Sequence, residues 1–197
     1  MSILFYYLAD LFKALNVSDQ YVIDSLPVAV CDNIQIGRCR LVKGEEYRGK
    51  IASKRRFFFG FQPGHRAVQL IITFYKEPVQ FFLLPGSVAD VTALQMMHLE
   101  LPTGSEVFGD AGHTDYEQEA LYAECEHIYV QIQRRSNNKR ADQPWQAGYK
   151  KRVRQRIEQA FSQITLRIPK KIHAITEAGF LIKIVLFLLA YALETSL

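Results

Sequence analysis

The chain has 197 residues, of which 49% are hydrophobic and 22% are charged. This balance excludes an intrinsically disordered chain, and the length suits one domain better than two. The net charge of +4 is compatible with a nucleic-acid partner and equally with an ordinary cytoplasmic protein.

The cysteine content restricts the class of protein further. Cys31, Cys39 and Cys125 form an odd set without a CxxC pair. This pattern argues against a disulfide framework and against a structural zinc site. We therefore expect reduced thiols and a cytoplasmic location.

The first predicted element is a helix within residues 1–17, because apolar residues recur at positions 4, 5, 8, 11, 12 and 15. The segment lacks a basic region and a small-residue cleavage site, so it is a poor signal peptide. Two β-prone runs follow, at residues 21–24 (YVID) and 26–30, and residues 41–54 are polar and predicted to form a loop.

An antiparallel meander is predicted next. Residues 56–61, 68–75 and 79–84 are β-prone, with a turn at Pro63 and Gly64 between the first two. The remaining elements alternate in type and are expected in this order: a helix at 90–98 capped by Ser87 or Asp90, a strand at 106–109, a helix at 115–124, a strand at 128–132, a basic loop at 134–144, and helices at 150–166 and 176–194.

Strand–helix alternation after a meander implies an α/β fold, with a mixed sheet flanked by helices. The apolar run at residues 180–193 is interrupted by Lys183 and is shorter than the roughly 20 residues of a membrane-spanning helix. We expect this helix to be buried against the sheet, with no membrane partner.

Three carboxylates stand out by position. Asp24 and Asp110 end predicted strands, and Glu158 lies beside the apolar stripe of its helix, four residues after Arg154. Glu158 either forms a surface ion pair with Arg154 or joins the two aspartates in a metal site. Mg²⁺ prefers oxygen ligands, and two such ions can support phosphoryl transfer.

Longer segments carry a resemblance. Residues 22–40 (VIDSLPVAVCDNIQIGRCR) and 44–54 (GEEYRGKIASK) resemble the region around the first catalytic aspartate of bacterial insertion-sequence DDE transposases. Further segments that resemble this family follow in order: FFLLPGSVAD at 81–90, VFGDAGHTDYE at 107–117, YKKRVRQRIEQAFSQI at 149–164 with its R-x-x-x-E pattern, and the closing helix at 173–193.

The resemblance implies a ribonuclease H-like fold and metal-dependent DNA cleavage and strand transfer. Asp24, Asp110 and Glu158 would be the catalytic residues and would hold two Mg²⁺ or Mn²⁺ ions, with Arg154 orienting a phosphate or carboxylate. The expected partners are transposon ends and target DNA, with a homodimer for the full-length protein and no small-molecule substrate.

The chain departs from the family pattern at three places. Family members carry a longer N-terminal helical region, so residues 1–19 are expected to be its remnant and residues 20–197 the catalytic domain. The Pro63–Gly64 pair interrupts a strand of the family pattern. His113 replaces a common tyrosine and is expected to be either exposed or close to the metal. The alternative function is therefore a truncated, inactive remnant that at most binds DNA.

Basic residues gather in the loop and in the helix that carries Glu158. They either lie on solvated surfaces or contact DNA phosphates, and the predicted DNA-binding residues are Arg134, Arg135, Lys139, Arg140, Lys150, Lys151, Arg152 and Arg154.

Overall fold

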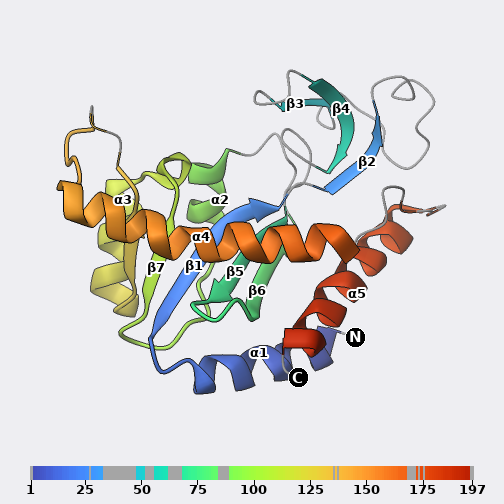
Figure 1. The fold of residues 1–197 in the computed structure, drawn as a ribbon, viewed down its shortest axis with the longest axis horizontal. Coiled ribbons are helices and arrows are strands. Elements are labelled where there is room, and N and C mark those ends of the chain that lie inside the picture. Colours follow the sequence, from blue (N-terminus) through green and yellow to red (C-terminus); the bar gives the residue numbers. More distant parts are fainter. Residues whose placement is uncertain are drawn as a thin grey trace.

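The computed structural model describes residues 2–26, 28–32, 48–51, 56–61, 68–83, 89–134, 136, 138–167, 172, 174 and 176–195. A five-stranded sheet lies at the centre, in the order β6-β5-β1-β7-β8 (Figure 1). Its strands are β1 (Gln20–Leu26), β5 (Val68–Thr73), β6 (Pro78–Leu83), β7 (Glu106–Gly109) and β8 (Tyr129–Ile132).

The central sheet is mixed. Strand β1 pairs antiparallel with β5 and parallel with β7, while β5–β6 is antiparallel and β7–β8 is parallel. Helices flank this sheet, so the predicted ribonuclease H-like α/β class is confirmed. Because β1 and β7 are neighbours and run in the same direction, their carboxyl ends meet at one edge of the sheet.

A separate three-stranded sheet corrects two predictions. Strands β2 (Val28–Asp32), β4 (Arg56–Phe61) and β3 (Arg48–Ile51) pair in that order. Strand β3 lies inside the predicted loop at 41–54, because its polar RGKI sequence gives little strand signal. Strand β4 leaves the predicted meander, which consists instead of β1, β5 and β6. The predicted turn at Pro63 and Gly64 lies outside the described residues.

The helices follow the prediction closely. They are α1 (Ser2–Leu15), α2 (Asp90–Met96), α3 (Tyr116–Leu121) with a π-helical turn at Tyr122–Glu126, α4 (Pro144–Arg167) and α5 (Glu177–Thr195). Helix α4 begins six residues before the predicted start, because its first turn lacks an apolar stripe and begins instead with Pro144, a residue favoured at the first helical position. It lies across β1 and β7 (Figure 1).

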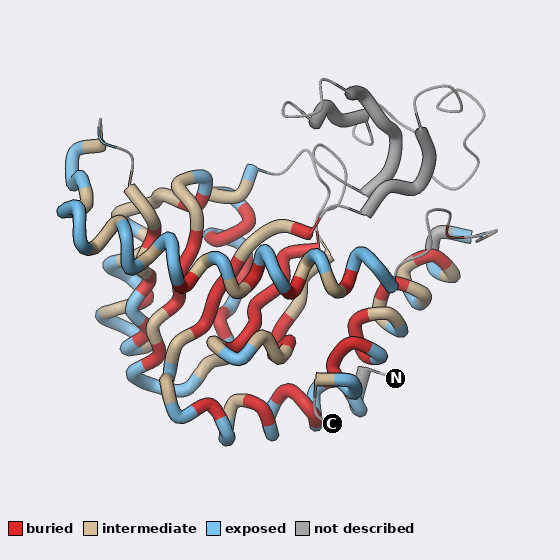
Figure 2. Tube along the Cα trace, in the orientation of Figure 1, coloured by how far each residue is buried: buried red, intermediate tan, exposed pale blue. Residues whose placement is uncertain are grey.

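Apolar side chains of the sheet and helices share one core. Every residue of β5 is buried, and buried positions alternate with exposed ones along α4 (Figure 2). Helix α1 packs on β6, where the rings of Phe5 and Phe81 meet edge to face at 4.9 Å. The boundary expected after residue 19, between an N-terminal remnant and the catalytic domain, stays a prediction.

Helix α5 packs against α1 and α4. Among the described helices it alone, at Ala178–Thr195, is long and apolar enough to cross a membrane, by length and composition only. One of its stripes is nevertheless buried in the core, as predicted, although the main partners of the helix are α1 and α4 rather than the sheet. The stripe consists of Phe180, Ile184, Leu188, Tyr191 and Ala192.

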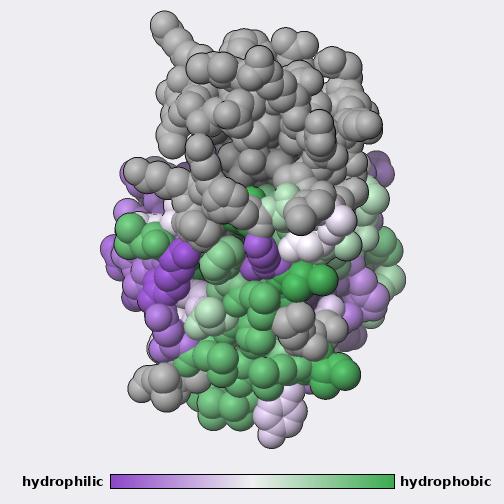
Figure 3. All heavy atoms as spheres, turned by 90° about the vertical axis from the view of Figure 1, so that its right-hand side faces the viewer, coloured by the Kyte–Doolittle hydropathy of each residue, from purple (hydrophilic) through white to green (hydrophobic). Residues whose placement is uncertain are grey.

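Apolar side chains also reach the surface on the side of the molecule where α1 and α5 lie. Figure 3 shows them gathered on this face. The exposed members are Ile3, Leu4, Tyr7, Leu11 and Leu15 of α1 and Ile182, Leu186 and Leu193 of α5. Large contiguous apolar surfaces on soluble proteins mark interaction sites.

Gly148 gives a direct test of α4. A Cβ added there meets no atom within 4 Å, so Gly148→Ala should raise the free energy of unfolding by about 0.5–1 kcal/mol through lower backbone entropy of the unfolded chain. Urea denaturation measures this change. Gly179→Ala is the comparison, because its Cβ would lie 3.1 Å from Thr176 Oγ1 and the gain should be smaller. A less stable Gly148→Ala protein would contradict the helix described for this segment.

Candidate active site

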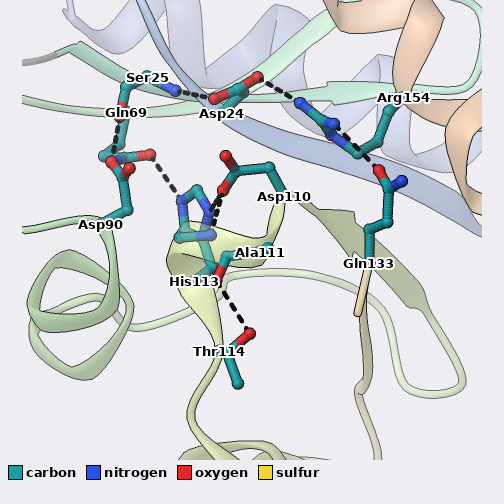
Figure 4. A network of polar contacts seen from close by, with 11 residues as sticks. Asp24, Ser25, Gln69, Asp90, Asp110, Ala111, His113, Thr114, Gln133 and Arg154 are labelled. Atoms are coloured by element: carbon teal, nitrogen blue, oxygen red, sulfur yellow. Dashed lines mark hydrogen bonds and ion pairs between the residues drawn. The ribbon is translucent and has the colours of Figure 1, made fainter. Parts of the chain in front are cut away.

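Two aspartates meet at the carboxyl edge shared by β1 and β7. Asp24 lies two residues before the end of β1, and Asp110 directly follows β7. Asp110 also caps the short 3₁₀ turn Ala111–His113. Figure 4 shows both residues within one network of polar contacts.

The carboxylate of Asp24 is held on both oxygens. Oδ1 accepts a hydrogen bond from Ser25 N at 2.8 Å, and Oδ2 accepts one from Arg154 Nη2 at 3.2 Å. Its pKa is raised, chiefly by burial and further by the charge of Asp110, although Ser25 and Arg154 act in the opposite direction. A carboxylate that is costly to ionise alone is stabilised by a nearby cation.

Asp110 is held on one oxygen only. Oδ1 accepts hydrogen bonds from Gly112 N at 2.9 Å and from His113 Nδ1 at 2.8 Å. Oδ2 accepts none within the part of the chain that the structure describes. Burial raises the pKa of this carboxyl, but the hydrogen bond and charge of His113, together with the N–H of Gly112 and the charge of Arg154, lower it overall. Asp110 therefore stays ionised with one oxygen available to a ligand.

The histidine of the site is fully buried, so the predicted exposed position of His113 is wrong. The 3₁₀ turn folds its ring back beneath the end of β7, and its Nε2 lies 3.5 Å from Gln69 Oε1. Burial lowers the pKa of His113, but the hydrogen bond to Asp110 and the charge of Asp90 raise it overall. The alternative expectation, a position close to a metal, stays a prediction.

Gln69 and Asp90 were missed by sequence reasoning. Gln69 Nε2 donates to Ser25 Oγ at 2.7 Å and to Asp90 Oδ1 at 3.0 Å, and Ser25 Oγ donates to Asp90 at 2.5 Å. The predicted cap by Asp90 is wrong, because Ala89 is the N-cap of α2 and makes no side-chain cap; Ser87 lies outside the described residues. Gln69 is a polar residue in the otherwise largely apolar strand VQLIIT, and this break in the pattern was the signal that could have identified it.

These side chains contain one candidate metal-binding group among the described residues. One ligand atom each from Asp90, Asp110 and His113 lies within 4.8 Å of the others. Ser25 links Asp24 to this group, because its backbone N–H donates to Asp24 and its hydroxyl donates to Asp90 (Figure 4).

Glu158 is exposed on α4 and is not part of this network. Its side chain makes no ion pair or hydrogen bond with the described residues, and Arg154 donates to Asp24 and Gln133 rather than to Glu158. Residues four apart lie on the same side of a helix. Glu158 therefore projects one turn beyond Arg154, and its catalytic role stays a prediction.

The predicted DNA-binding residues fall into two groups. Three are engaged within the protein: Arg134 pairs with Glu119 and lies 4.6 Å from the Tyr116 ring, Lys150 pairs with Asp142 at 2.7 Å, and Arg154 pairs with Asp24. The exposed ones are Lys139, Arg140, Lys151 and Arg152, of which Arg140 also lies 4.9 Å from the Tyr116 ring, and Arg135 lies outside the described residues. Their DNA contacts stay a prediction.

Comparison with known proteins gives one match. A family model described as a transposase DDE domain matches residues 16–174, from the residue after α1 to beyond the end of α4. No curated protein and no solved structure matches the chain.

Proposed function

The chain belongs to the transposase DDE domain family, and from this premise we propose that it cuts and joins DNA strands in a metal-dependent reaction during transposition of an insertion sequence. The observation that carries the proposal is the meeting of Asp24 and Asp110 at one sheet edge, with Asp110 Oδ2 open to a ligand. Glu158 is the proposed third carboxylate.

The donor set suits a hard divalent cation. Asp24, Asp110 and Glu158 offer only oxygen ligands, as Mg²⁺ and Mn²⁺ prefer, and would hold two ions. Bound ions of this kind lower the pKa of an attacking hydroxyl and stabilise the leaving oxygen. Because the carboxylates of Asp24 and Asp110 repel each other, a bound cation is favoured there on electrostatic grounds.

Arg154 orients Asp24 in this proposal. Its guanidinium bonds Asp24 on one side and Gln133 Oε1 on the other at 3.2 Å, so the group is fixed in place. The charge of Arg154 also offsets that of Asp24 before metal binds. An arginine held in this way can contact a phosphate from its remaining donors.

Exposed basic residues are proposed to contact the DNA backbone. Lys151→Gln together with Arg152→Gln should weaken DNA binding and reduce the steepness of its salt dependence by about 0.9 per lost phosphate contact. Fluorescence anisotropy of labelled duplex DNA at several salt concentrations measures both. Lys13→Gln on α1 is the control and should change neither. An unchanged salt dependence in the double variant would remove α4 from the DNA-binding surface.

A homodimer and a cytoplasmic location are further parts of the proposal. The apolar side chains exposed on α1 and α5 support a contact with a second copy. The free thiol of Cys125 is exposed, which agrees with a reducing compartment.

Nicking of supercoiled plasmid by the purified full chain tests the proposed function. Open-circular product should form with Mg²⁺ or Mn²⁺ and not with excess EDTA. Absence of nicking by a folded protein in both metals would contradict the proposal and favour the alternative, an inactive remnant that at most binds DNA.

A further inference from the structure

A chain of polar side chains connects Asp110 to helix α2. His113 Nδ1 contacts Asp110 Oδ1, His113 Nε2 faces Gln69 Oε1, and the amide nitrogen of Gln69 contacts Asp90 (Figure 4). Both His113 and Gln69 are buried, with exposed fractions of 0% and 1%. Buried polar groups connected in this way fix one another's orientation.

We infer that His113 is a positioning residue that holds Asp110 Oδ1 and thereby leaves Oδ2 for the metal, and that it is not itself a metal ligand. The inference rests on the proposed function, because it concerns the metal site of the same reaction. It departs from the simplest interpretation of the Asp90, Asp110 and His113 group, in which all three side chains would coordinate one ion.

The surroundings of the ring carry the argument. The amide nitrogen of Gln69 is engaged by Ser25 Oγ and Asp90 Oδ1, so the carbonyl oxygen of Gln69 is the atom that faces His113 Nε2. His113 Nδ1 faces the carboxylate of Asp110. Both ring nitrogens thus face protein oxygens, at 2.8 Å and 3.5 Å, so a metal ion would have to displace Asp110 or Gln69 to reach either of them.

Asp90 is the fixed end of this chain. It begins α2 and accepts from both Ser25 and Gln69 on Oδ1. Ser25 is also the neighbour whose backbone N–H holds Asp24. The same anchor therefore orients both aspartates of the proposed metal site, one through Ser25 and the other through Gln69 and His113. Removing a residue that orients a metal ligand, without binding the metal itself, commonly lowers metal affinity 10–100-fold.

Three substitutions of His113 separate the roles. Asn places an amide N–H close to the position of Nδ1 and can still donate to Asp110, whereas Gln places its amide close to Nε2 and reaches Gln69 instead. Leu removes both donors. The dissociation constant for Mn²⁺, measured by the EPR signal of the free ion, should rise roughly 10–100-fold in His113→Leu and His113→Gln. Most of this loss should be recovered in His113→Asn.

Pulsed EPR of Mn²⁺ bound to the parent chain provides a second readout that does not depend on the stability of any variant. We expect no directly coordinated imidazole nitrogen. A coordinated nitrogen, or equal dissociation constants in the parent and all three variants, would overturn the inference. An absence of Mn²⁺ binding by the folded parent would instead contradict the proposed function and remove the inference with it.

Discussion

Asp110→Asn should lower the rate of metal-dependent strand cleavage by about 10³-fold, which corresponds to roughly 4 kcal/mol of transition-state stabilisation. Asparagine has the same size and can still accept hydrogen bonds from Gly112 N and His113 on its carbonyl oxygen. What it loses is the negative charge and the oxygen that is open to a ligand. The fold should therefore persist while the metal site fails.

Asp24→Asn and Glu158→Gln should each cause a loss of similar size in the same plasmid-nicking assay. Asp10→Asn is the matched control, because Asp10 is exposed on α1, pairs with Lys13 and lies outside the proposed site. Circular dichroism confirms that each variant is folded. Cleavage by Asp110→Asn at the parent rate would contradict the assignment of Asp110, and an active Glu158→Gln would limit the site to the two aspartates.

Gly112→Ala should lower the same cleavage rate by about 10–100-fold, although it adds a single methyl group. The added Cβ would lie 3.0 Å from Asp110 Oδ1 and 3.0 Å from Asp90 Oδ2. Both carboxylates are already held by hydrogen bonds, so neither can move without losing one. A displaced Asp110 places its free oxygen away from the position that the metal requires.

Displacement of Asp110 can be distinguished from a general loss of structure by the metal concentration that gives half-maximal nicking. This concentration should rise in Gly112→Ala. Gly148→Ala is the control, because its added Cβ meets no atom within 4 Å and its nicking rate should equal that of the parent. Unchanged metal dependence in Gly112→Ala would show that Asp110 is not constrained in the way described.

Local pattern was sufficient to predict most elements, whereas the choice of Asp24 and Asp110 depended on the resemblance to the transposase family. The strand ending at Gly109 is confirmed at both ends, and Asp24 and Asp110 lie together because neighbouring parallel strands end at one sheet edge. The mixed sheet also followed from the order of the elements. These features depend on apolar periodicity and on the order of elements, which the sequence carries directly.

Features that depend on long-range pairing were not predictable in the same way. Strand β4 has a strong strand pattern, but nothing local indicates that it pairs with β2 and β3 while β5 pairs with β1. Burial of His113 depends on the 3₁₀ turn and on Gln69, which is 44 residues away. Likewise, Asp90 resembles a helix cap in sequence, yet its partners come from β1 and β5.

Iron-directed cleavage of the polypeptide tests the central claim most directly. Fe²⁺ in place of Mg²⁺, with ascorbate and peroxide, produces radicals that cut the backbone close to the bound ion, and mass spectrometry locates the cuts. The account predicts cuts near Asp24, Asp110 and Glu158, all suppressed by excess Mg²⁺ and absent in Asp110→Asn. Cuts elsewhere, or cuts that Asp110→Asn leaves unchanged, would contradict a metal site built from these three carboxylates.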